Sequence, residues 1–293
     1  MVLTEQQKYI GNTALGVTGG AAAYAWCPRF VNKQYAKLFN KYCDNFSSQE
    51  QKDIWQAAQK ALADSSIKDK VTLIDYNTTN WEPIADEIVK KRREHINRIK
   101  GPISKLLSKL RLNDEEFKEH FYTIAQGKNA CFVPSTSQVL VNKEKKANTA
   151  FHELGHALNA NSSENIVKKL ARSRNKYLGL IPLIFGTSML IPKDREDKPT
   201  QHPIYQALLF FKKISGLLVS ACFLPIVTEE GLASLRGAEL AKKLLSPELC
   251  SKVNKANGIA FGSYALAMIL AGAATTFANY LKDKVTGPLP PKN

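Results

Sequence analysis

The sequence predicts a mainly α-helical protein with a small β-element, an apolar helical hairpin and a further apolar helix near the C-terminus. Helical hydrophobic spacing and uncharged apolar stretches dominate the chain, whereas β-type runs are confined to short segments around residues 71–76 and 130–141. At 293 residues with 44% hydrophobic content, the chain can bury a sizeable core in one large or two smaller domains.

Composition divides the chain into four parts. An N-terminal apolar segment covers residues 1–27 and a basic helical region covers residues 28–125. A core region at residues 126–250 contains the apolar hairpin at 177–227, and residues 251–293 form a C-terminal transmembrane-like helix and tail.

The first half of the chain supplies three local signals. Ile10–Trp26 is a short, Gly- and Ala-rich apolar segment, Ser47–Glu50 has the pattern of a helix start with a Ser cap, and Val71–Tyr76 has the composition of a strand. Lys90–Arg111 is strongly basic, with apolar residues at helical spacing on either side of Gly101 and Pro102. Two interpretations stay open for it: docking on anionic lipid, or the solvated face of an ordinary helix.

A short hairpin precedes the central motif. Ala130–Val133 and Gln138–Val141 are β-type runs joined by Pro134–Ser137. An edge strand at this position can pair with an extended peptide through backbone hydrogen bonds, without a specific side chain.

The central motif is His-Glu-Leu-Gly-His at residues 152–156, inside a stretch predicted to be helical. Positions i and i+4 share one helix face, so His152 and His156 can present two imidazoles to one metal ion. Glu153 lies beside them, where it can accept a proton from a metal-bound water. The spacing is that of zinc metalloproteases and predicts one Zn²⁺ per chain.

A catalytic zinc needs a third protein ligand, and the best candidates are the adjacent Glu229 and Glu230, which follow an apolar run. The two side chains differ by about 100° around a helix, so only one can face the metal. We choose Glu230, with Glu229 as the fallback, and note that a nearby carboxylate can instead orient a ligand imidazole.

Apolar stretches follow the motif. Tyr177–Pro192 and Ile214–Val227 flank a polar loop at Lys193–Pro203, which predicts a helical hairpin that enters or crosses a membrane, or else two buried helices of a soluble core. Gly258–Leu281 is the one stretch that comfortably meets the roughly 20 apolar residues of a spanning helix. Its Gly258 and Gly262 have GxxxG spacing, which indicates either close helix packing or simply a Gly/Ala-rich helix.

The charge balance indicates an anionic partner. The formal charge is +15 and the pI is about 9.5. No RRM, zinc-finger or helix-turn-helix signature is present, so we expect an anionic membrane lipid rather than nucleic acid. The apolar stretches lead us to expect a multi-pass membrane protein, and because the region around the motif is basic, we expect its catalytic face toward the cytoplasm. The five cysteines are scattered, which fits a reducing compartment.

Several of these features together resemble a known family, the integral-membrane zinc metallopeptidases that include the heat-shock protease HtpX and the CAAX prenyl proteases. The similarity covers roughly residues 125–240: HELGH, a strand-like segment at Asn129, an intervening hydrophobic hairpin, and Glu230-Gly-Leu-Ala-Ser234 in place of the family's ExxA[D]. It implies a zincin-like metallopeptidase domain with the hairpin inserted between HExxH and the third ligand. It also implies His152, His156 and Glu230 as ligands and Glu153 as the base. Ser234 departs from the family's Asp.

The expected function is therefore a membrane-associated zinc endopeptidase acting on a protein or peptide substrate, with Glu153 as general base. Two alternatives stay open: a catalytically inactive membrane-associated scaffold with a degenerate protease fold, and a soluble gluzincin peptidase. An intact Glu153 argues against the scaffold, which has no use for a base beside the metal.

Overall fold

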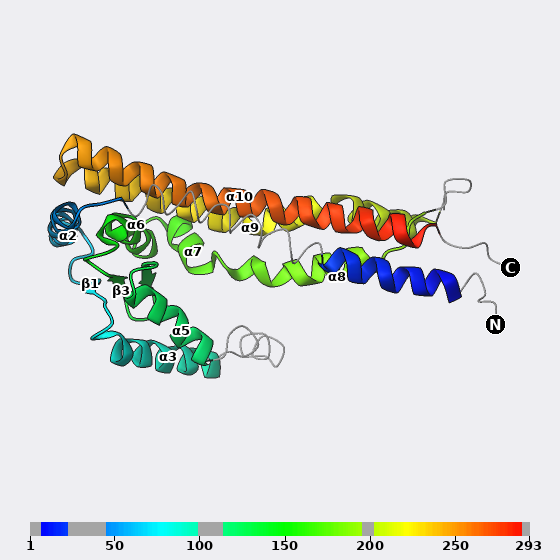
Figure 1. Ribbon diagram of the computed structural model, residues 1–293, viewed down its shortest axis with the longest axis horizontal. Coiled ribbons are helices and arrows are strands. Elements are labelled where there is room, and N and C mark those ends of the chain that lie inside the picture. The colour runs from blue at the N-terminus through cyan, green and yellow to red at the C-terminus, as the bar shows by residue number, and fades with distance from the viewer. Residues whose placement is uncertain (1–6, 23–44, 99–113, 195–201, 289–293) are drawn as a thin grey trace. The chain divides into compact units, whose positions relative to one another are not determined.

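The computed structural model describes residues 7–22, 45–98, 114–194 and 202–288 (Figure 1). It is mainly helical with one three-stranded sheet, as predicted. The chain forms two compact units. The sheet unit consists of Phe39–Arg172 and Glu229–Phe261, and the apolar-helix unit consists of Met1–Leu38, Ser173–Thr228 and Gly262–Asn293.

The sheet confirms the predicted strands to within a residue or two. Strands β1 (Thr72–Asp75), β2 (Cys131–Val133) and β3 (Gln138–Val141) lie in the order β1-β3-β2. β1 is parallel to β3, and β2 is antiparallel to β3, so β2 is an edge strand joined to β3 by a tight turn. Ser137 has a positive φ of 56° in that turn.

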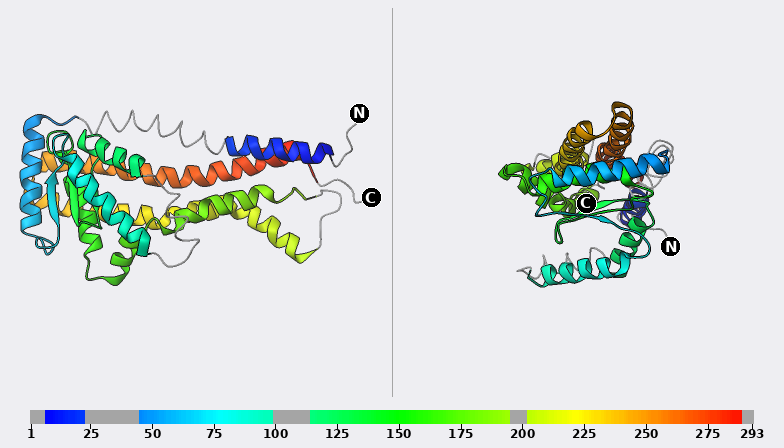
Figure 2. Two further views of the ribbon diagram at one scale, coloured as in Figure 1. Left: turned by 90° about the horizontal axis from the view of Figure 1, so that it is seen from below. Right: turned by 90° about the vertical axis from the view of Figure 1, so that its left-hand side faces the viewer.

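Two hydrophobic cores lie on the two faces of this sheet. Helices α2 (Ser48–Ala63) and α6 (Ala150–Ala160) contribute to the core that contains Val139 and Val141 of β3. Helices α3 (Trp81–Arg98) and α5 (Asp114–Ala125) contribute to the other core, which contains Leu140. This alternation follows from the two-residue side-chain period of a strand. Figure 2 shows α2 and α3 on opposite sides of the sheet.

The predicted start of α2 is confirmed in detail. Ser47 is the N-cap, its hydroxyl accepts from the backbone N–H of Glu50, and the Glu50 carboxylate accepts from the backbone N–H of Ser47. This capping box fixes one end of a helix whose inner face lines the first core.

The apolar hairpin has a different form from the expected one. Its first arm is a 3₁₀ turn at Lys176–Leu180 followed by α8 (Ile181–Leu190). Its second arm is the beginning of α9 (Pro203–Leu244), a single helix that runs without interruption through Pro225 and past Glu229 and Glu230. The two carboxylates therefore lie within a continuous helix and not at the start of a new one.

The predicted C-terminal helix is present as α10 (Pro247–Thr286). Both α9 and α10 are long and apolar enough to span a membrane, whereas the sequence had singled out the α10 segment alone. Of their most apolar windows, 28% and 22% respectively are buried. The remaining helical elements are a 3₁₀ turn at Ala147–Thr149, α7 (Asn165–Ser173) and a helix at residues 7–22.

Within the apolar-helix unit, glycines mark the closest helix contacts. A Cβ on Gly216 of α9 would meet the carbonyl oxygen of Gly272 of α10 at 2.6 Å. A Cβ on Gly272 would likewise meet the carbonyl oxygen of Gly216 at 2.6 Å. Residues 7–22 lie along the end of α10, where a Cβ on Gly16 would meet the Lys282 carbonyl oxygen at 3.0 Å (Figure 1). Gly258 of the GxxxG pattern has no neighbour within 4 Å, so close packing is found at Gly216 and Gly272 instead.

Parts of four predictions lie outside the described residues. They are the basic segment beyond residue 98, the C-terminal end of the first apolar segment, most of the hairpin loop, and the last residues of the tail.

Candidate metal centre

Helix α6 presents the central motif inside the sheet unit. Every residue from Ala150 to Ala157 is buried, including His152, Glu153 and His156. The helix packs against β2, β3 and α2. A helix that is buried on all sides can carry three ionisable residues only if they have polar partners.

Those partners come from α9. The two helices touch at two glycines, one on each helix, and each glycine lies against the backbone of the other helix. A Cβ on Gly155 of α6 would be 2.0 Å from the carbonyl oxygen of Ala233, and a Cβ on Gly237 of α9 would be 2.5 Å from that of Phe151. The lack of side chains at both positions lets the two backbones approach closely. Glu229 and Glu230, 1% and 2% exposed, are thereby held against the motif.

Three potential ligand atoms converge between the two helices. The Nε2 atoms of His152 and His156 are 3.0 Å apart, and Glu230 Oε2 lies 3.1 Å from the first and 3.4 Å from the second. A tetrahedral zinc with ligands at about 2.0–2.1 Å separates neighbouring ligand atoms by about 3.3 Å. The three residues form a buried group that could hold a metal ion, and their spacing fits zinc.

The opposite ring nitrogens are also held. His156 Nδ1 lies 2.8 Å from Glu229 Oε1, and His152 Nδ1 lies 3.1 Å from Ser234 Oγ. An ionised carboxylate can only accept, so His156 carries a hydrogen on Nδ1, and its Nε2 is the atom turned toward His152 and Glu230. A hydroxyl that accepts from His152 Nδ1 gives the same tautomer there. Two bare Nε2 lone pairs at 3.0 Å would repel each other, so this contact needs either a proton or a metal ion.

Asn159 holds the carboxylate that contacts His156. Its Nδ2 donates to Glu229 Oε1 at 3.2 Å, and the side chain is fully buried. Asn159 lies three residues after His156 on the same face of α6. The chain Asn159–Glu229–His156 fixes the orientation of this imidazole, as outer partners of metal-binding histidines commonly do.

The surrounding carboxylates alter the basicity of His156. Burial acts to lower its pKa, but hydrogen bonds with Glu229 and Glu230 and the charge of Glu153 outweigh burial and raise the pKa to about 10. Without metal, the site therefore holds a proton that neutralises part of its negative charge. A metal cation would take the place of that proton.

Glu153 faces the edge strand. Its Oε2 accepts a hydrogen bond of 2.8 Å from the backbone N–H of Phe132 in β2. Glu153 therefore lies between the imidazoles on its own helix and the outer edge of the sheet. This is the edge at which the sequence predicts backbone pairing with an extended peptide.

The structure thus brings together His152, His156 and Glu230, with Glu153 adjacent, and assigns Glu229 to the outer face of His156. Sequence reasoning anticipated a second carboxylate orienting an imidazole. It missed the role of Asn159, although its i+3 spacing from His156 was visible. At Ser234 it noted only the departure from Asp, whereas the hydroxyl makes the contact with His152.

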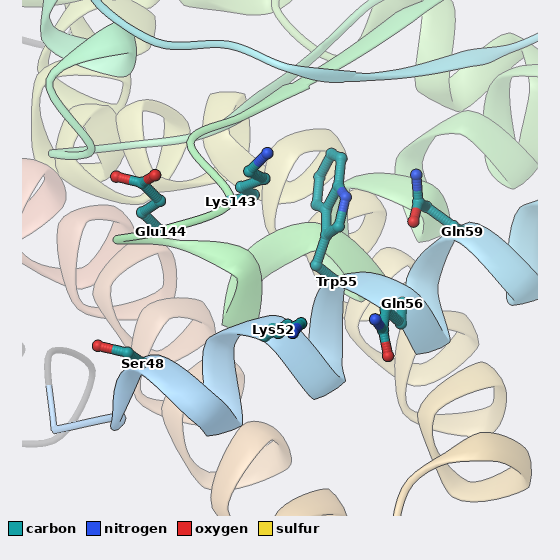
Figure 3. Close-up of a pocket in the computed structure, with 7 residues that line it drawn as sticks. All are labelled: Ser48, Lys52, Trp55, Gln56, Gln59, Lys143 and Glu144. Carbon is teal, nitrogen blue, oxygen red and sulfur yellow. The ribbon is translucent and has the colours of Figure 1, made fainter.

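A separate groove lies between α2 and the loop after β3. It has a volume of about 580 Å³ and is lined by Ser48, Lys52, Trp55, Gln56, Gln59, Lys143 and Glu144. Figure 3 shows the Trp55 ring rising from α2 between Lys143 and Gln59, with Glu144 next to Lys143. None of these residues belongs to the metal centre, and the groove has no cluster of metal-ligating groups.

Comparisons of the chain with protein-family models, with curated proteins and with solved structures found no match. The geometry of the centre and the residues that form it are therefore the guide to its function.

Proposed function

We propose that this chain is a zinc-dependent endopeptidase associated with a membrane. The observation that carries the proposal is the arrangement around α6. Two imidazole Nε2 atoms and one carboxylate oxygen converge with tetrahedral spacing, and a further carboxylate, Glu153, lies beside them. This combination of three ligands and an adjacent base is the one that metal-assisted peptide hydrolysis requires.

His152, His156 and Glu230 would hold the zinc, which when bound would lower the pKa of a water ligand to about 7 and polarise the substrate carbonyl. Glu153, next to these ligands, would act as the general base, taking a proton from the attacking water and passing it to the leaving amine. Glu229 keeps His156 with a hydrogen on Nδ1, and Ser234 does the same for His152 when its hydroxyl accepts from Nδ1, so that the Nε2 atoms face the metal position.

The hydrogen bond between Phe132 N–H and Glu153 suggests how a substrate is placed. An extended peptide that pairs with the outer edge of β2 lies next to the base and the metal ligands. Recognition through the backbone would tolerate varied side chains.

Membrane association is supported by α9 and α10, because most residues of their apolar windows are not buried by the protein. Outward-facing apolar helices of this length suit a lipid environment, where every backbone group is satisfied within the helix. The multi-pass topology and the cytoplasmic orientation of the catalytic face remain part of this proposal, on the basis of the positively charged residues around the motif.

The test is hydrolysis of fluorescently labelled casein by the purified full chain in mild detergent. We expect Glu153→Gln to retain zinc and to lose activity by about 10²–10⁴-fold, because the base is removed and the ligands are not. Glu239→Gln, an exposed position on α9, is the matched control and should cleave like the wild type. Equal activity in Glu153→Gln and wild type would refute the assigned base, and zinc binding without cleavage in any protein would favour a scaffold.

A further inference from the structure

The apolar-helix unit contains a cluster of buried charges away from the motif. Lys212 of α9 is 8% exposed and Lys282 of α10 is 1% exposed, and both lie next to Asp283. Burying an ammonium group among apolar helices is costly unless partners compensate for the lost water. The acceptors around the two ammonium groups therefore decide whether the charge of this cluster is balanced.

The two ammonium groups share the same few acceptors. Lys212 Nζ donates to the carbonyl oxygens of Ile191 at 2.9 Å and Pro192 at 3.4 Å, and to Asp283 Oδ1. Lys282 Nζ donates to the same Ile191 carbonyl oxygen at 2.6 Å and to the same carboxylate oxygen at 2.9 Å. One carboxylate faces two buried positive charges, so the cluster carries excess positive charge.

A cavity of about 350 Å³ opens beside this cluster. Its charged lining consists of Lys193, Lys212 and Lys213 against Asp194 and Asp283, so the described residues make it basic. A water molecule occupies about 30 Å³ of liquid, so the cavity has room for roughly a dozen waters or a phosphate with a small substituent.

Asn279 supplies an independent sign of a missing partner. It lines the cavity, is 5% exposed, and its Nδ2 donates to the hydroxyls of Ser188 and Ser215. Both hydroxyls use their own hydrogens on backbone carbonyls, so they can only accept from Asn279, which fixes the orientation of the amide. Asn279 Oδ1 is then a buried acceptor without a hydrogen-bond partner among the described residues. It suits a hydroxyl donor on a ligand.

The cavity is flanked by exposed apolar surface. Tyr280, part of the lining, is 58% exposed, and Phe277 lies three residues earlier on the same face of α10 with 53% exposure. On α9, Phe210 is 63% exposed and lies three residues before Lys213. Exposed aromatic side chains do not help to bind a free anion, whereas they can pack against the acyl chains of a lipid.

From these observations we propose that the cavity binds the phosphate of an anionic phospholipid whose headgroup carries a hydroxyl, such as phosphatidylglycerol. Lys193 and Lys213 contact the phosphate, the buried charge of Lys212 attracts it without a direct contact, Asn279 Oδ1 accepts from the headgroup hydroxyl, and the flanking aromatic side chains lie along the acyl chains. The bound lipid neutralises the excess charge of the cluster. This site does not depend on the metal centre or on peptidase activity.

The test is lipid binding to the full chain in non-ionic detergent, measured by native mass spectrometry with phosphatidylglycerol, phosphatidylcholine and inorganic phosphate as separate probes. We expect phosphatidylglycerol to bind, phosphatidylcholine to bind far more weakly because its choline opposes the lysines, and phosphate alone not to be retained. Each lysine near a lipid surface contributes a similar amount to the free energy of binding. Removing one, in K213Q, should weaken phosphatidylglycerol binding about fivefold, and removing two, in K193Q/K213Q, about thirtyfold.

Lys284→Gln is the matched control, because Lys284 is an exposed lysine on α10 outside the cavity, and it should bind like the wild type. Because Lys213 is exposed, K213Q should fold normally, and it can be measured even if the double variant fails to fold. Equal binding of phosphatidylglycerol to wild type and K213Q, or equal binding of both lipids, would overturn the proposal. Retention of inorganic phosphate as strong as that of phosphatidylglycerol would assign the cavity to a free anion instead.

Discussion

At the scale of single residues, the two imidazoles of the centre differ in what holds their Nδ1 atoms. His156 contacts a buried carboxylate that is itself held by Asn159, whereas His152 contacts the neutral hydroxyl of Ser234. A carboxylate partner increases the basicity of an imidazole more than a hydroxyl does. His156 is therefore the ligand whose protonation competes most directly with metal.

This difference gives a pH dependence. The pKa of His156 is raised from 6.5 to about 10, so metal-free protein at pH 8 carries a proton on this residue, and zinc must displace it. We expect release of about one proton from His156 for each zinc bound at pH 8, seen by calorimetric titration in buffers of different ionisation enthalpy. Zinc binding without proton release at pH 8 would contradict the assigned environment of His156.

The same shift affects the stability of the metal-free protein. Because the folded pKa lies above the unfolded value, the stabilisation from the protonated His156 is fully present below about pH 6.5 and is lost as the pH rises through about 10.

At the scale of secondary-structure elements, the centre depends on how closely α6 and α9 approach. Gly155 and Gly237 each lie against a backbone carbonyl of the other helix, and the ligands lie at the same contact. Since backbone atoms cannot move aside as a flexible side chain does, added volume here would push the helices apart and separate Glu230 from the imidazoles.

Gly155→Ala should therefore lower both stability and metal binding. Overpacking of this kind costs about 1–3 kcal/mol, and a shift of α9 weakens the metal site as well. Gly258→Ala in α10 is the control, since its Cβ meets nothing within 4 Å and a helical Gly→Ala change stabilises by about 0.5–1 kcal/mol. Thermal unfolding and zinc content of both variants check this. A Gly155→Ala protein as stable as the wild type would contradict the packing described here.

The elements also show what sequence alone can predict. The capping box at Ser47 and Glu50, the strands, and the i,i+4 pair His152 and His156 are local patterns, and all three were visible. The full length of α9, Pro203–Leu244, was not, because the apolar run Ile214–Val227 is bounded by charged residues and the pairing of Lys212 with Asp283 of α10 is not visible in the sequence. The contacts of Ser234 and Asn159 were also missed, because they depend on how two distant segments of the chain pack.

At the scale of the whole molecule, apolar helices and a polar sheet unit coexist in one chain. α9 and α10 each contribute to both units, and both are candidates for crossing a membrane. The buried pairing of Lys212 with Asp283 accounts for the inward-facing lysine of α9, since a buried charge requires a partner, whereas the adjacent Lys213 is exposed.

A membrane-spanning chain should resist extraction by alkaline carbonate and be released by non-ionic detergent. We expect nearly all of the expressed protein in the carbonate pellet, because α9 and α10 are long and apolar enough to span a membrane and most residues of their apolar windows are not buried within the protein. Release of the protein into the carbonate supernatant, with a monodisperse profile in the absence of detergent, would favour the soluble peptidase instead.

The most direct test of the central claim is the zinc content of the purified chain, measured by elemental analysis for the wild type and three carboxylate variants. We expect about one zinc per chain in the wild type and in the exposed-site control Glu239→Gln, little or none in Glu230→Gln, and about 10–100-fold weaker binding in Glu229→Gln, which loses an outer partner rather than a ligand. No zinc in the gently purified wild type, or equal retention in Glu230→Gln, would contradict the account of this metal centre.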